Sequence, residues 1–555
     1  MIFSIEMGFF DIEMMSKAHF LLHFDGFLEY YNYRYYRYVK GALMIPENVA
    51  KFRPGACTEI KNIGGNYYVY MYESVLLESG KWGKKTGKSI GKIIPDTGFI
   101  PNRNYHLYEG EEGKDDITIL EYGQYALIEA VAGDVKKLLE KYFNLERAAQ
   151  IFSYASIFLA NGFTHKDQVG VYYEQSWLQI EYSCYSFRMG RTAINTLLDD
   201  LGRRGTRVLE YENNAISMAD RMAIDGHAIR SCSDENDLGE AGYKFSSLKE
   251  DQVNLLMGYD ISSGSPVFSR MFRGSTSDKA AVKELCEVLS ISGILLVVDR
   301  GFYSADNLKM FSDNGNTYII PVPSNTSVFT KAMARIEYEG EFCYSSGKKH
   351  SRIQYMEVKL NEIESVYVFR DIDENSRTIY NYRHCIELGK DGYTEKGLEE
   401  KREFFGVYVL QTNSGLDPME VFCAYKTRWG IETFYQYIKN VADFNDLKEQ
   451  DYVRQQGLAF IMLIAGQLYS RLNNKVKELH NNTISVQDVL NMARFLKMDR
   501  KGDVWTCRNK RKKDLEVLEK LGFTPISTYR EKVYSEPICI LYSTILQVCF
   551  FSFLS

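Results

Sequence analysis

Ile294-Leu-Leu-Val-Val-Asp299-Arg-Gly-Phe-Tyr303 is an aliphatic, β-branched run that ends at an aspartate. It predicts a short buried strand, and the glycine turn that follows leads into a helical segment. The run Arg221-Met-Ala-Ile-Asp225-Gly-His-Ala-Ile is similar, with Asp225 inside a strand and Gly226 allowing close approach of another backbone. Taken alone, either aspartate is more simply explained as a turn former.

A stretch further along the chain, Ala424-Tyr-Lys-Thr-Arg-Trp-Gly-Ile-Glu-Thr-Phe-Tyr-Gln-Tyr-Ile-Lys439, has helical spacing. Tyr425, Arg428, Glu432 and Lys439 stand at relative positions 0, 3, 7 and 14, which at about 100° per residue fall within about 60° of one another. One helix face therefore carries a carboxylate, two cations and a phenol, with an apolar face opposite. A carboxylate beside phosphate-seeking groups indicates phosphodiester chemistry, which needs more carboxylates from elsewhere in the chain.

Together these residues resemble the DDE transposases of bacterial insertion sequences, in the subgroup with the Y-(2)-R-(3)-E-(6)-K pattern. The quartet at 425, 428, 432 and 439 matches that pattern at every spacing. The resemblance covers roughly residues 60 to 525, and it implies that Asp225, Asp299 and Glu432 are the catalytic acids. Ser275 stands where the family often has asparagine. Three further strings resemble the family: Arg428-Trp-Gly-Ile-Glu432, Val298-Asp299-Arg-Gly-Phe-Tyr303 and Gly274-Ser-Thr-Ser-Asp278.

The pattern from 221 to 322 predicts the order β, β, β, α, β, α, β. This order fits a ribonuclease-H-like sheet, with Asp225 on the first, central strand and Asp299 at the end of the neighbouring fourth strand. Glu432 comes 133 residues after Asp299, and the strand-like runs in that gap predict a β-rich insertion, which the resembling subgroup also carries. Asp417-Pro418 then starts the Glu432 helix. The fold class is α/β in the core and α+β overall, with helical regions on both sides of the core.

Three carboxylates in one cleft repel one another, and hard divalent cations relieve that repulsion best. We expect two Mg²⁺ ions about 4 Å apart, with Mn²⁺ as a substitute. Asp225 is expected to bridge both ions, while Asp299 and Glu432 each hold one. His227, two residues after Asp225, is either a neighbour of the metals or a hydrogen-bonded strand histidine, with the second reading favoured.

The groups expected to contact DNA lie near these acids. Arg428 and Lys439 suit the phosphates that flank the cut, and the resemblance assigns both of them, together with Tyr425, to the DNA end. Arg300 follows Asp299 directly and is a further candidate. Trp429 either stacks on a displaced base or packs at the helix edge.

The chain of 555 residues carries a formal charge of −6, which argues against a uniformly basic DNA-coating protein. Contacts to nucleic acid must therefore come from local patches. Solvated charged surface is the alternative explanation for each patch. The two candidate patches are Arg188, Arg191, Arg203, Arg204 and Arg207, and Arg500, Lys501, Arg508, Lys510, Arg511, Lys512 and Lys513.

The N-terminus lacks the features of a secretory signal, so we expect a bacterial cytoplasmic protein that joins the nucleoid when bound to DNA. The apolar end of the chain is interpreted as an end strand, a packed tail or an atypical extension, with membrane insertion as the minor alternative. The predicted domains are an aromatic extension (1–57), a small β unit (58–110), a helical region that binds the DNA ends (111–215), the two parts of the core (216–324 and 405–445), the β-rich insertion between them (325–404), a helical C-terminal region (446–530) and a hydrophobic tail (531–555).

The sequence thus predicts a transposase that binds terminal inverted repeats in double-stranded DNA, cleaves the element ends and joins the freed 3′-hydroxyls to target DNA. Both ends must be held together, which predicts a homodimer. An inactive or domesticated DNA-binding relative and a structure-specific endonuclease without strand transfer remain as alternatives. A glycosidase reading ranks last, because it explains neither the third acid nor the cations beside Glu432.

Overall fold

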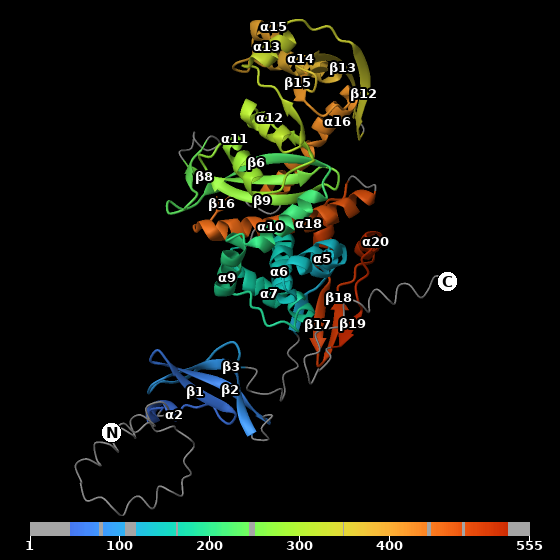
Figure 1. Ribbon diagram of the computed structural model, residues 1–555. Coiled ribbons are helices and arrows are strands. Elements are labelled where there is room, and N and C mark those ends of the chain that lie inside the picture. Colours follow the sequence, from blue (N-terminus) through green and yellow to red (C-terminus); the bar gives the residue numbers. More distant parts are fainter. Residues whose placement is uncertain are drawn as a thin grey trace, which may run out of the picture. The chain divides into compact units, whose positions relative to one another are not determined.

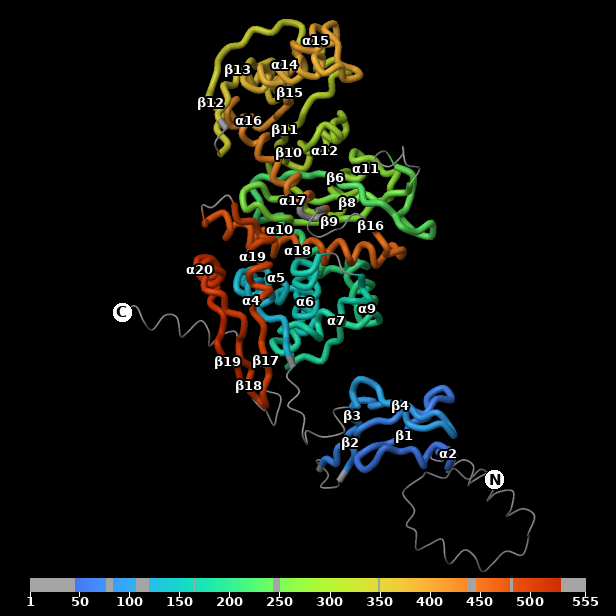
Figure 2. Tube along the Cα trace, turned by 180° about the vertical axis from the view of Figure 1, so that it is seen from behind, coloured from blue at the N-terminus to red at the C-terminus, as the bar shows by residue number. Residues whose placement is uncertain are grey.

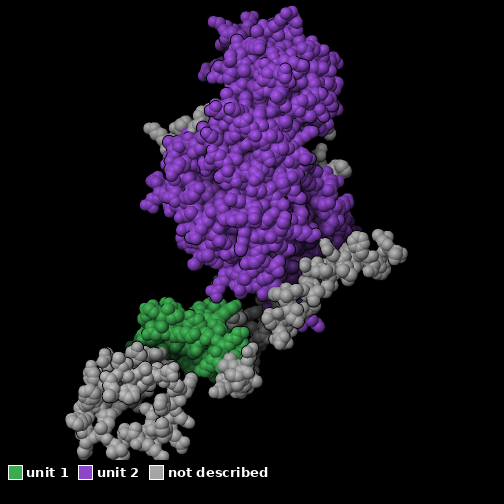
Figure 3. Space-filling model, viewed as in Figure 1, with its two compact units in different colours: residues 1–116 green, residues 117–555 purple. Residues whose placement is uncertain are grey.

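The computed structural model describes residues 45–76, 82–105, 118–162, 165–242, 250–347, 349–440, 446–479 and 483–530. The chain divides into two compact units, residues 1–116 and 117–555 (Figure 3). The aromatic segment 1–44 and the apolar segment 531–555 lie outside the described residues. Across the described residues, we find no helix with both the length and the apolar character that a bilayer crossing requires.

The first unit is a four-stranded antiparallel sheet with a short helix (Figure 1). Gly64 and Gly65 both have positive φ (59° and 84°), which gives the tight turn between the first two strands. Val49, Val69, Ile90 and Ile93 form its buried core. The elements are α2 (Glu47–Ala50), β1 (Thr58–Ile63), β2 (Asn66–Leu76), β3 (Trp82–Ile94) and β4 (Gly98–Pro101), with the strands adjacent in that order.

The second unit is built on a mixed sheet that has eleven strands in the described residues (Figure 2). Its central strand β6 pairs with β8 on one side, antiparallel, and with β10 on the other, parallel. β9 continues the sheet beyond β8, and β11 lies parallel to β10. These elements are β6 (Arg221–Ser231), β7 (Glu240–Ala241), β8 (Asp251–Asp260), β9 (Ser265–Arg273), α11 (Asp278–Val288), β10 (Leu295–Val298), η4 (Arg300–Phe302), α12 (Ala305–Asp313) and β11 (Thr317–Pro321).

The predicted core order of three strands and then alternating helices and strands is present, with the two-residue β7 added between β6 and β8. Ser277 and Ser304 start α11 and α12 by accepting hydrogen bonds from the backbone N–H groups of Ala280 and Asn307. Successive residues of β6 point to opposite faces of the sheet. Met222 belongs to the core that also contains residues of α11 and α12, whereas Ala223 belongs to the core that contains residues of α18.

The segment between β11 and the Glu432 helix contains helices as well as strands, and its strands extend the core sheet. β15 pairs antiparallel with β11, and β14, β13 and β12 follow outward in that order. The free edge of β11 offers unpaired backbone groups that β15 satisfies, so the insertion and the core share one sheet. The elements are α13 (Ser327–Met333), β12 (Gly340–Ser346), β13 (Lys349–Lys359), β14 (Ser365–Asp371), α14 (Ile372–Glu387), α15 (Glu395–Lys401) and β15 (Val407–Thr412).

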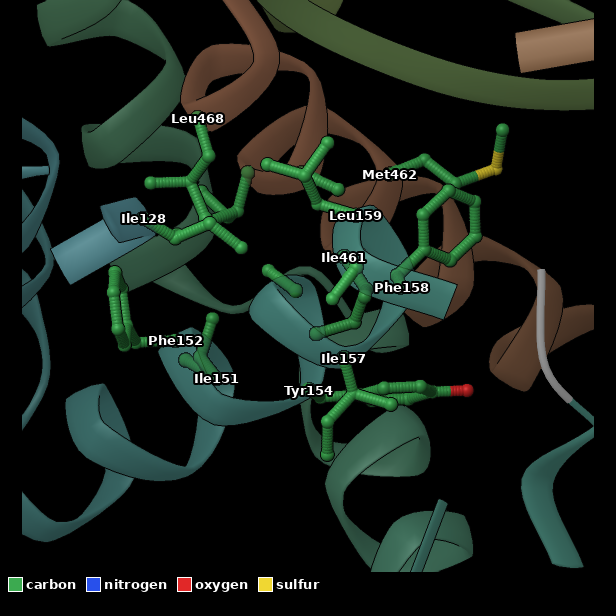
Figure 4. Close-up of a cluster of buried hydrophobic side chains, with 14 of the residues drawn as sticks. Ile128, Ile151, Phe152, Tyr154, Ile157, Phe158, Leu159, Ile461, Met462 and Leu468 are labelled. Carbon is green, nitrogen blue, oxygen red and sulfur yellow. The ribbon is translucent and has the colours of Figure 1, made fainter. Parts of the chain in front are cut away.

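A helical layer packs against the sheet through the long helix α18, which contacts β9, α6 and α9 (Figure 1). Phe152, Ile157, Phe158, Ile461 and Met462 meet in the largest core (Figure 4). The helices are α4 (Gly123–Val131), α5 (Gly133–Tyr142), α6 (Leu145–Asn161), α7 (Lys166–Gln175), α8 (Leu178–Glu181), α9 (Arg191–Gly202), α10 (Thr206–Ser217) and α18 (Tyr452–Glu478).

The C-terminal region, predicted to be helical, also contains strands. Gly502 at φ 60° makes the turn of a hairpin, and Met498, Trp505 and Cys507 point into the core from alternate positions. The hairpin pairs with β5 from the other end of the unit, a partner more than 370 residues away in the sequence. The elements are β5 (Thr118–Glu121), β16 (Asp446–Leu447), α19 (Val486–Arg494), β17 (Lys497–Lys501), β18 (Val504–Arg508), α20 (Lys512–Lys520) and β19 (Thr528–Arg530).

Candidate active site

The two predicted aspartates lie on one face of the central sheet. Ala223 and Ile229 of β6 face the core that contains α18, and Asp225 stands at an alternate position between them. Asp299 directly follows β10 in extended conformation (φ −80°, ψ 165°) and continues the face of Val297. β6 and β10 are parallel neighbours, with Val298 paired to Ile224, so Asp225 and Asp299 lie side by side on the same face.

The helix that carries Glu432 lies against this face. The Tyr435 hydroxyl donates a hydrogen bond to the Asp225 carbonyl at 2.7 Å. The ring of His227 stacks on that of Tyr435, with centroids 5.1 Å apart and an interplanar angle of 20°. His227 therefore contributes to the docking of the helix on β6, whichever groups its ring nitrogens contact.

The predicted single helix is two helices that meet at Arg428. The first, α16 (Pro418–Thr427), starts at Asp417 with a capping box to Glu420 and Pro418 at its first position, as the sequence predicts. The second is α17 (Trp429–Asn440). The Arg428 N–H donates to the Tyr425 carbonyl, three residues back, and Ile431 donates to Arg428 in the same way. These tighter turns interrupt the α-helix and turn the Arg428 side chain toward the sheet.

Arg428 lies at the centre of the acid cluster. Its Nη2 is 2.5 Å from Glu432 Oε1, and its Nη1 is 3.9 Å from Asp225 Oδ2. The residue is only 9% exposed. Burial alone would lower the pKa of the guanidinium, but the charges of Asp299, Asp225 and Glu432 hold that pKa above its ordinary value. All three predicted acids are therefore close enough to act on one buried cation.

Tyr425 is the phenol of this cluster. The guanidinium carbon of Arg428 lies 5.9 Å from the centre of its ring. Burial raises the pKa of the Tyr425 hydroxyl; Arg428 opposes the shift, and the charges of Asp299 and Glu432 add to it. Tyr425 therefore shares the pocket of the acids and stays protonated at neutral pH.

A fourth carboxylate, Asp278, contacts the backbones that carry the two predicted aspartates. A Cβ atom built on Gly226 would lie 2.9 Å from Asp278 Oδ1, and one built on Gly301 would lie 2.9 Å from Asp278 Oδ2. Only glycine at these two positions gives the carboxylate this room. Sequence reasoning noted the string that ends in Asp278 but gave this residue no role. The signal that was available is the pair of glycines, one directly after Asp225 and one two residues after Asp299.

The other predicted DNA-contacting residues lie at the surface near this cluster. Trp429 is 61% exposed at the start of α17. Lys439, in the last turn of the same helix, and Arg300, directly after Asp299, are also exposed. Arg428 differs from them, because the sequence predicts a phosphate contact whereas the structure places its guanidinium among the acids.

The donor set suits a hard divalent cation, since it consists of carboxylate oxygens. Over the described residues, however, no three His, Cys, Asp or Glu side chains are arranged to hold a metal ion as they stand. The Arg428 guanidinium lies among them, and its Nε is buried without a hydrogen-bond partner in the described part of the chain. The side chains present therefore have the chemistry of a metal site in which an internal cation balances the charge.

In the structure, some residues of the two predicted basic patches contact other residues of the protein. Arg204 has a side chain only 11% exposed, and it pairs with the buried Glu212, so this member of the first patch is structural. In the second patch, Arg508 pairs with Asp499 at 2.9 Å, and Arg511 lies over the Phe495 ring at 3.6 Å. Part of each patch is thus engaged within the protein.

Comparisons with known proteins agree with this geometry. Residues 217–467 match the family model described as a transposase DDE domain. The transposase of insertion sequence element IS231E from Bacillus thuringiensis subsp. finitimus is 27% identical over 251 residues, which cover 41% of this chain and 51% of the relative. The transposase of IS1151 from Clostridium perfringens is 22% identical over 247 residues, which cover 40% and 50%.

The matched segment spans about half the length of these relatives. Among solved structures, a piggyBac transposase synaptic complex with hairpin DNA has 12% identity and a TM-score of 0.33, covering 69% of this chain and 74% of that chain. The family match spans Asp225, Asp299 and Glu432, which the structure gathers around Arg428. Residues 217–467 of this chain are thus similar to the transposase DDE domain, and the relatives that they match are transposases of insertion sequences.

Proposed function

We propose that this chain is a DNA transposase that binds terminal inverted repeats, cleaves the phosphodiester at the element ends and transfers the 3′-hydroxyl ends to target DNA. The observation that carries the proposal is the convergence of Asp225, Asp299 and Glu432 on Arg428, within a segment that matches a transposase DDE domain. The quartet of Tyr425, Arg428, Glu432 and Lys439 supports the Y-R-E-K subgroup.

The core of the proposed enzyme is ribonuclease-H-like. The strands that carry the site follow the spatial order β9, β8, β6, β10, β11, in which the first three are antiparallel neighbours and the last two are parallel to β6. This arrangement puts Asp225, in the middle of β6, beside Asp299, directly after β10, so that two acids from distant parts of the chain can share one substrate phosphate.

Asp225, Asp299 and Glu432 would hold two Mg²⁺ ions, or Mn²⁺ in their place. When bound, such ions activate the attacking oxygen and stabilise the leaving oxygen of the phosphodiester. In their absence, Arg428 neutralises part of the charge of the three acids. The buried phenol of Tyr425 remains protonated and can donate a hydrogen bond to a DNA phosphate at the edge of the cluster.

The surface near the acids supports the DNA contacts of the proposal. Lys439 and Arg300 are exposed cations suited to phosphates on either side of the cut, and the exposed Trp429 ring can stack on a displaced base. Both transposon ends have to be held together, so the working form is a homodimer on paired ends. Its substrate would keep the protein at the bacterial nucleoid.

The test uses the full chain with Mg²⁺ and a labelled duplex that carries the terminal repeats flanking its own coding region. Asp225→Asn and Asp299→Asn should each abolish cleavage while end binding in a gel-shift assay stays within about twofold of wild type. Asp306→Asn makes the same change at an exposed position of α12 and should cleave like wild type. Cleavage retained by either variant of the acid cluster would overturn the assignment.

The same assay separates the two alternatives. A strand-transfer product, with the labelled end joined to a target plasmid, supports a transposase. Cleavage without a joined product would indicate a structure-specific endonuclease. Repeat binding without cleavage by the wild-type chain would indicate an inactive DNA-binding relative.

A further inference from the structure

One face of the small sheet packs into the core of the first unit, and the opposite face carries tyrosines and lysines. Val69 of β2 is buried among Ile90, Ile93 and Val49. Because side chains alternate along a strand, Tyr68, Tyr70 and Tyr72 project from the opposite face. These three tyrosines are half-buried, so their rings lie along the sheet surface with part of each ring accessible.

Lysines surround the tyrosines on that second face. Lys61 of β1 and Lys92 of β3 stand directly opposite Tyr68 in the two flanking strands. The Lys61 Nζ lies 5.1 Å from the centre of the Tyr70 ring, and the Lys84 Nζ lies 4.3 Å from that of Tyr72. Lys84 and Lys92 are exposed. We call this set (Tyr68, Tyr70, Tyr72, Lys61, Lys84 and Lys92) the tyrosine-lysine face.

The acid on the same face is already engaged. Glu59 pairs with Lys61 at 3.0 Å and accepts a hydrogen bond from the Thr86 hydroxyl at 2.6 Å. The bond from Thr86 and the charge of Lys61 lower the pKa of Glu59 despite some burial. Lys84 and Lys92 therefore dominate the charge that this face presents to solvent.

The charge of the small sheet itself points to the same class of partner. Its described residues, 45–76 and 82–105, carry eight Lys and Arg against four Asp and Glu, a net charge of +4. The complete chain has a formal charge of −6. Positive charge is therefore concentrated in these two segments of the sheet, where it can neutralise phosphates locally.

From this geometry we propose that the tyrosine-lysine face binds DNA, with lysines on the phosphates and tyrosine rings against bases that are not stacked in a duplex. The inference rests on the proposed function for the choice of DNA as the nucleic acid. Aromatic rings on an open sheet flanked by cations provide both contacts that single strands need, a stacking surface and a charged track. The face would add a DNA contact separate from the acid cluster.

The experiment measures fluorescence anisotropy of a labelled single-stranded oligonucleotide, and of a duplex of the same sequence, with the full chain at several salt concentrations. The double variant Lys84→Gln/Lys92→Gln should weaken binding of the single strand about tenfold at low salt and reduce the slope of log K against log salt by about 1.4. The matched control Lys51→Gln/Lys85→Gln removes the same charge from the same unit; Lys51 lies in the turn after α2, and Lys85 is one residue from Lys84 on the other side of β3. The control should leave both quantities near wild type.

The tyrosines are tested by Tyr70→Leu/Tyr72→Leu. This change should weaken binding of the single strand at least about fivefold while duplex binding changes less, because a duplex keeps its bases stacked. Unchanged melting temperatures of the variants establish that the unit has folded.

Equal losses for the two lysine doubles, or full single-strand binding by the tyrosine variant, would overturn the inference. The proposed function and this inference can be refuted independently of each other. A wild-type chain that binds neither oligonucleotide nor its terminal repeats overturns both, whereas a chain that cleaves its repeats with an inert tyrosine-lysine face overturns only the inference.

Discussion

The guanidinium of Arg428 fills the space among three carboxylates that would otherwise repel one another. Its ion pair with Glu432 and its approach to Asp225 give the cluster a cation that belongs to the chain itself. Arg428 therefore balances part of the negative charge of the cluster. If these acids hold Mg²⁺ as proposed, the ions and the guanidinium would compete for the charge of the same carboxylates.

Arg428→Gln should lower the free energy of unfolding by about 2 kcal/mol in EDTA, because the buried carboxylates lose a charged hydrogen-bond donor. Mg²⁺ should then raise the melting temperature of the variant more than that of wild type, as the acids gain a cation that they lack. Thermal unfolding with and without Mg²⁺ measures both effects. Arg300→Gln, the same substitution at an exposed position directly after Asp299, serves as the control, and an identical Mg²⁺ response in the Arg428 variant would contradict the competition.

At the scale of secondary structure, local signals in the sequence predicted the elements that start with their own caps. Ser277, Ser304 and Asp417 begin helices where their side chains predict them. The break at Arg428 could not be predicted in this way. Every residue from 424 to 439 is compatible with a continuous helix, so the local sequence carries no signal for the tighter turns at Arg428.

The same limit applies to pairing between distant strands. The sequence predicts a helical C-terminal region over 446–530 and a basic patch from 499 to 513, and neither prediction includes the hairpin of β17 and β18. Its strand character depends on β5, whose backbone groups pair with it across most of the chain. The resemblance to a family led to the three acids, whose catalytic role stays a prediction. No pattern gave Asp278 a role, because its closeness to Gly226 and Gly301 arises only from packing.

The helices α9 and α18 pack so closely at Gly457 that adding one methyl group there tests their contact. A Cβ atom on Gly457 would lie 2.1 Å from the Leu198 carbonyl oxygen. Helix propensity alone predicts that Gly457→Ala stabilises α18 by about 1 kcal/mol, whereas the backbone collision predicts a loss of about 3 kcal/mol. We expect the loss, measured by urea unfolding. Gly133→Ala in α5, where a Cβ meets nothing within 4 Å, should change stability by less than about 0.5 kcal/mol, and a stabilised Gly457 variant would show that the helices can separate.

The short strand β16 is held to the end of β6 by an ion pair whose pH dependence has a defined sign. Arg230 Nε and Nη2 donate to the two oxygens of Asp446 at 2.7 and 2.8 Å. The hydrogen bond from Arg230, with its charge, outweighs partial burial and lowers the pKa of Asp446 below 3.8. The stabilisation is therefore fully present above pH 3.8 and is lost as pH falls through the lowered pKa of the folded state.

Asp446→Asn should cost about 0.5 kcal/mol at about pH 6, a small value because the side chain is 37% exposed and the pair is screened by solvent. The difference between variant and wild type should shrink as the pH falls below 3.8. Urea unfolding of both proteins at several pH values measures this difference. A gap that stays constant down to about pH 3 would exclude titration of Asp446 as its cause.

At the scale of the whole molecule, the second unit depends on one buried charge cluster between its sheet and its helical layer. Glu212 of α10 accepts hydrogen bonds from Arg270 of β9 at 2.6 Å and from Arg204 at 3.2 Å. Arg204 also donates hydrogen bonds to the Ser269 carbonyl at 2.7 Å and to the Gln456 side chain of α18 at 3.1 Å. One carboxylate thus neutralises two buried guanidinium groups and links α10, β9 and α18.

Replacing Glu212 by Gln keeps the shape of the side chain and removes the only charge that balances both arginines within this set. Two buried cations without a counter-charge should cost about 3 to 5 kcal/mol in the free energy of unfolding. The substitution weakens the contact between the sheet and the helical layer. The contacts of β9 and those of α18 should therefore be lost together, in a single unfolding transition. Glu210→Gln, an exposed neighbour on the same helix, should unfold like wild type. A loss below about 1 kcal/mol in the Glu212 variant would mean that water or another group neutralises the arginines, and that this charge cluster does not hold the sheet to its helical layer.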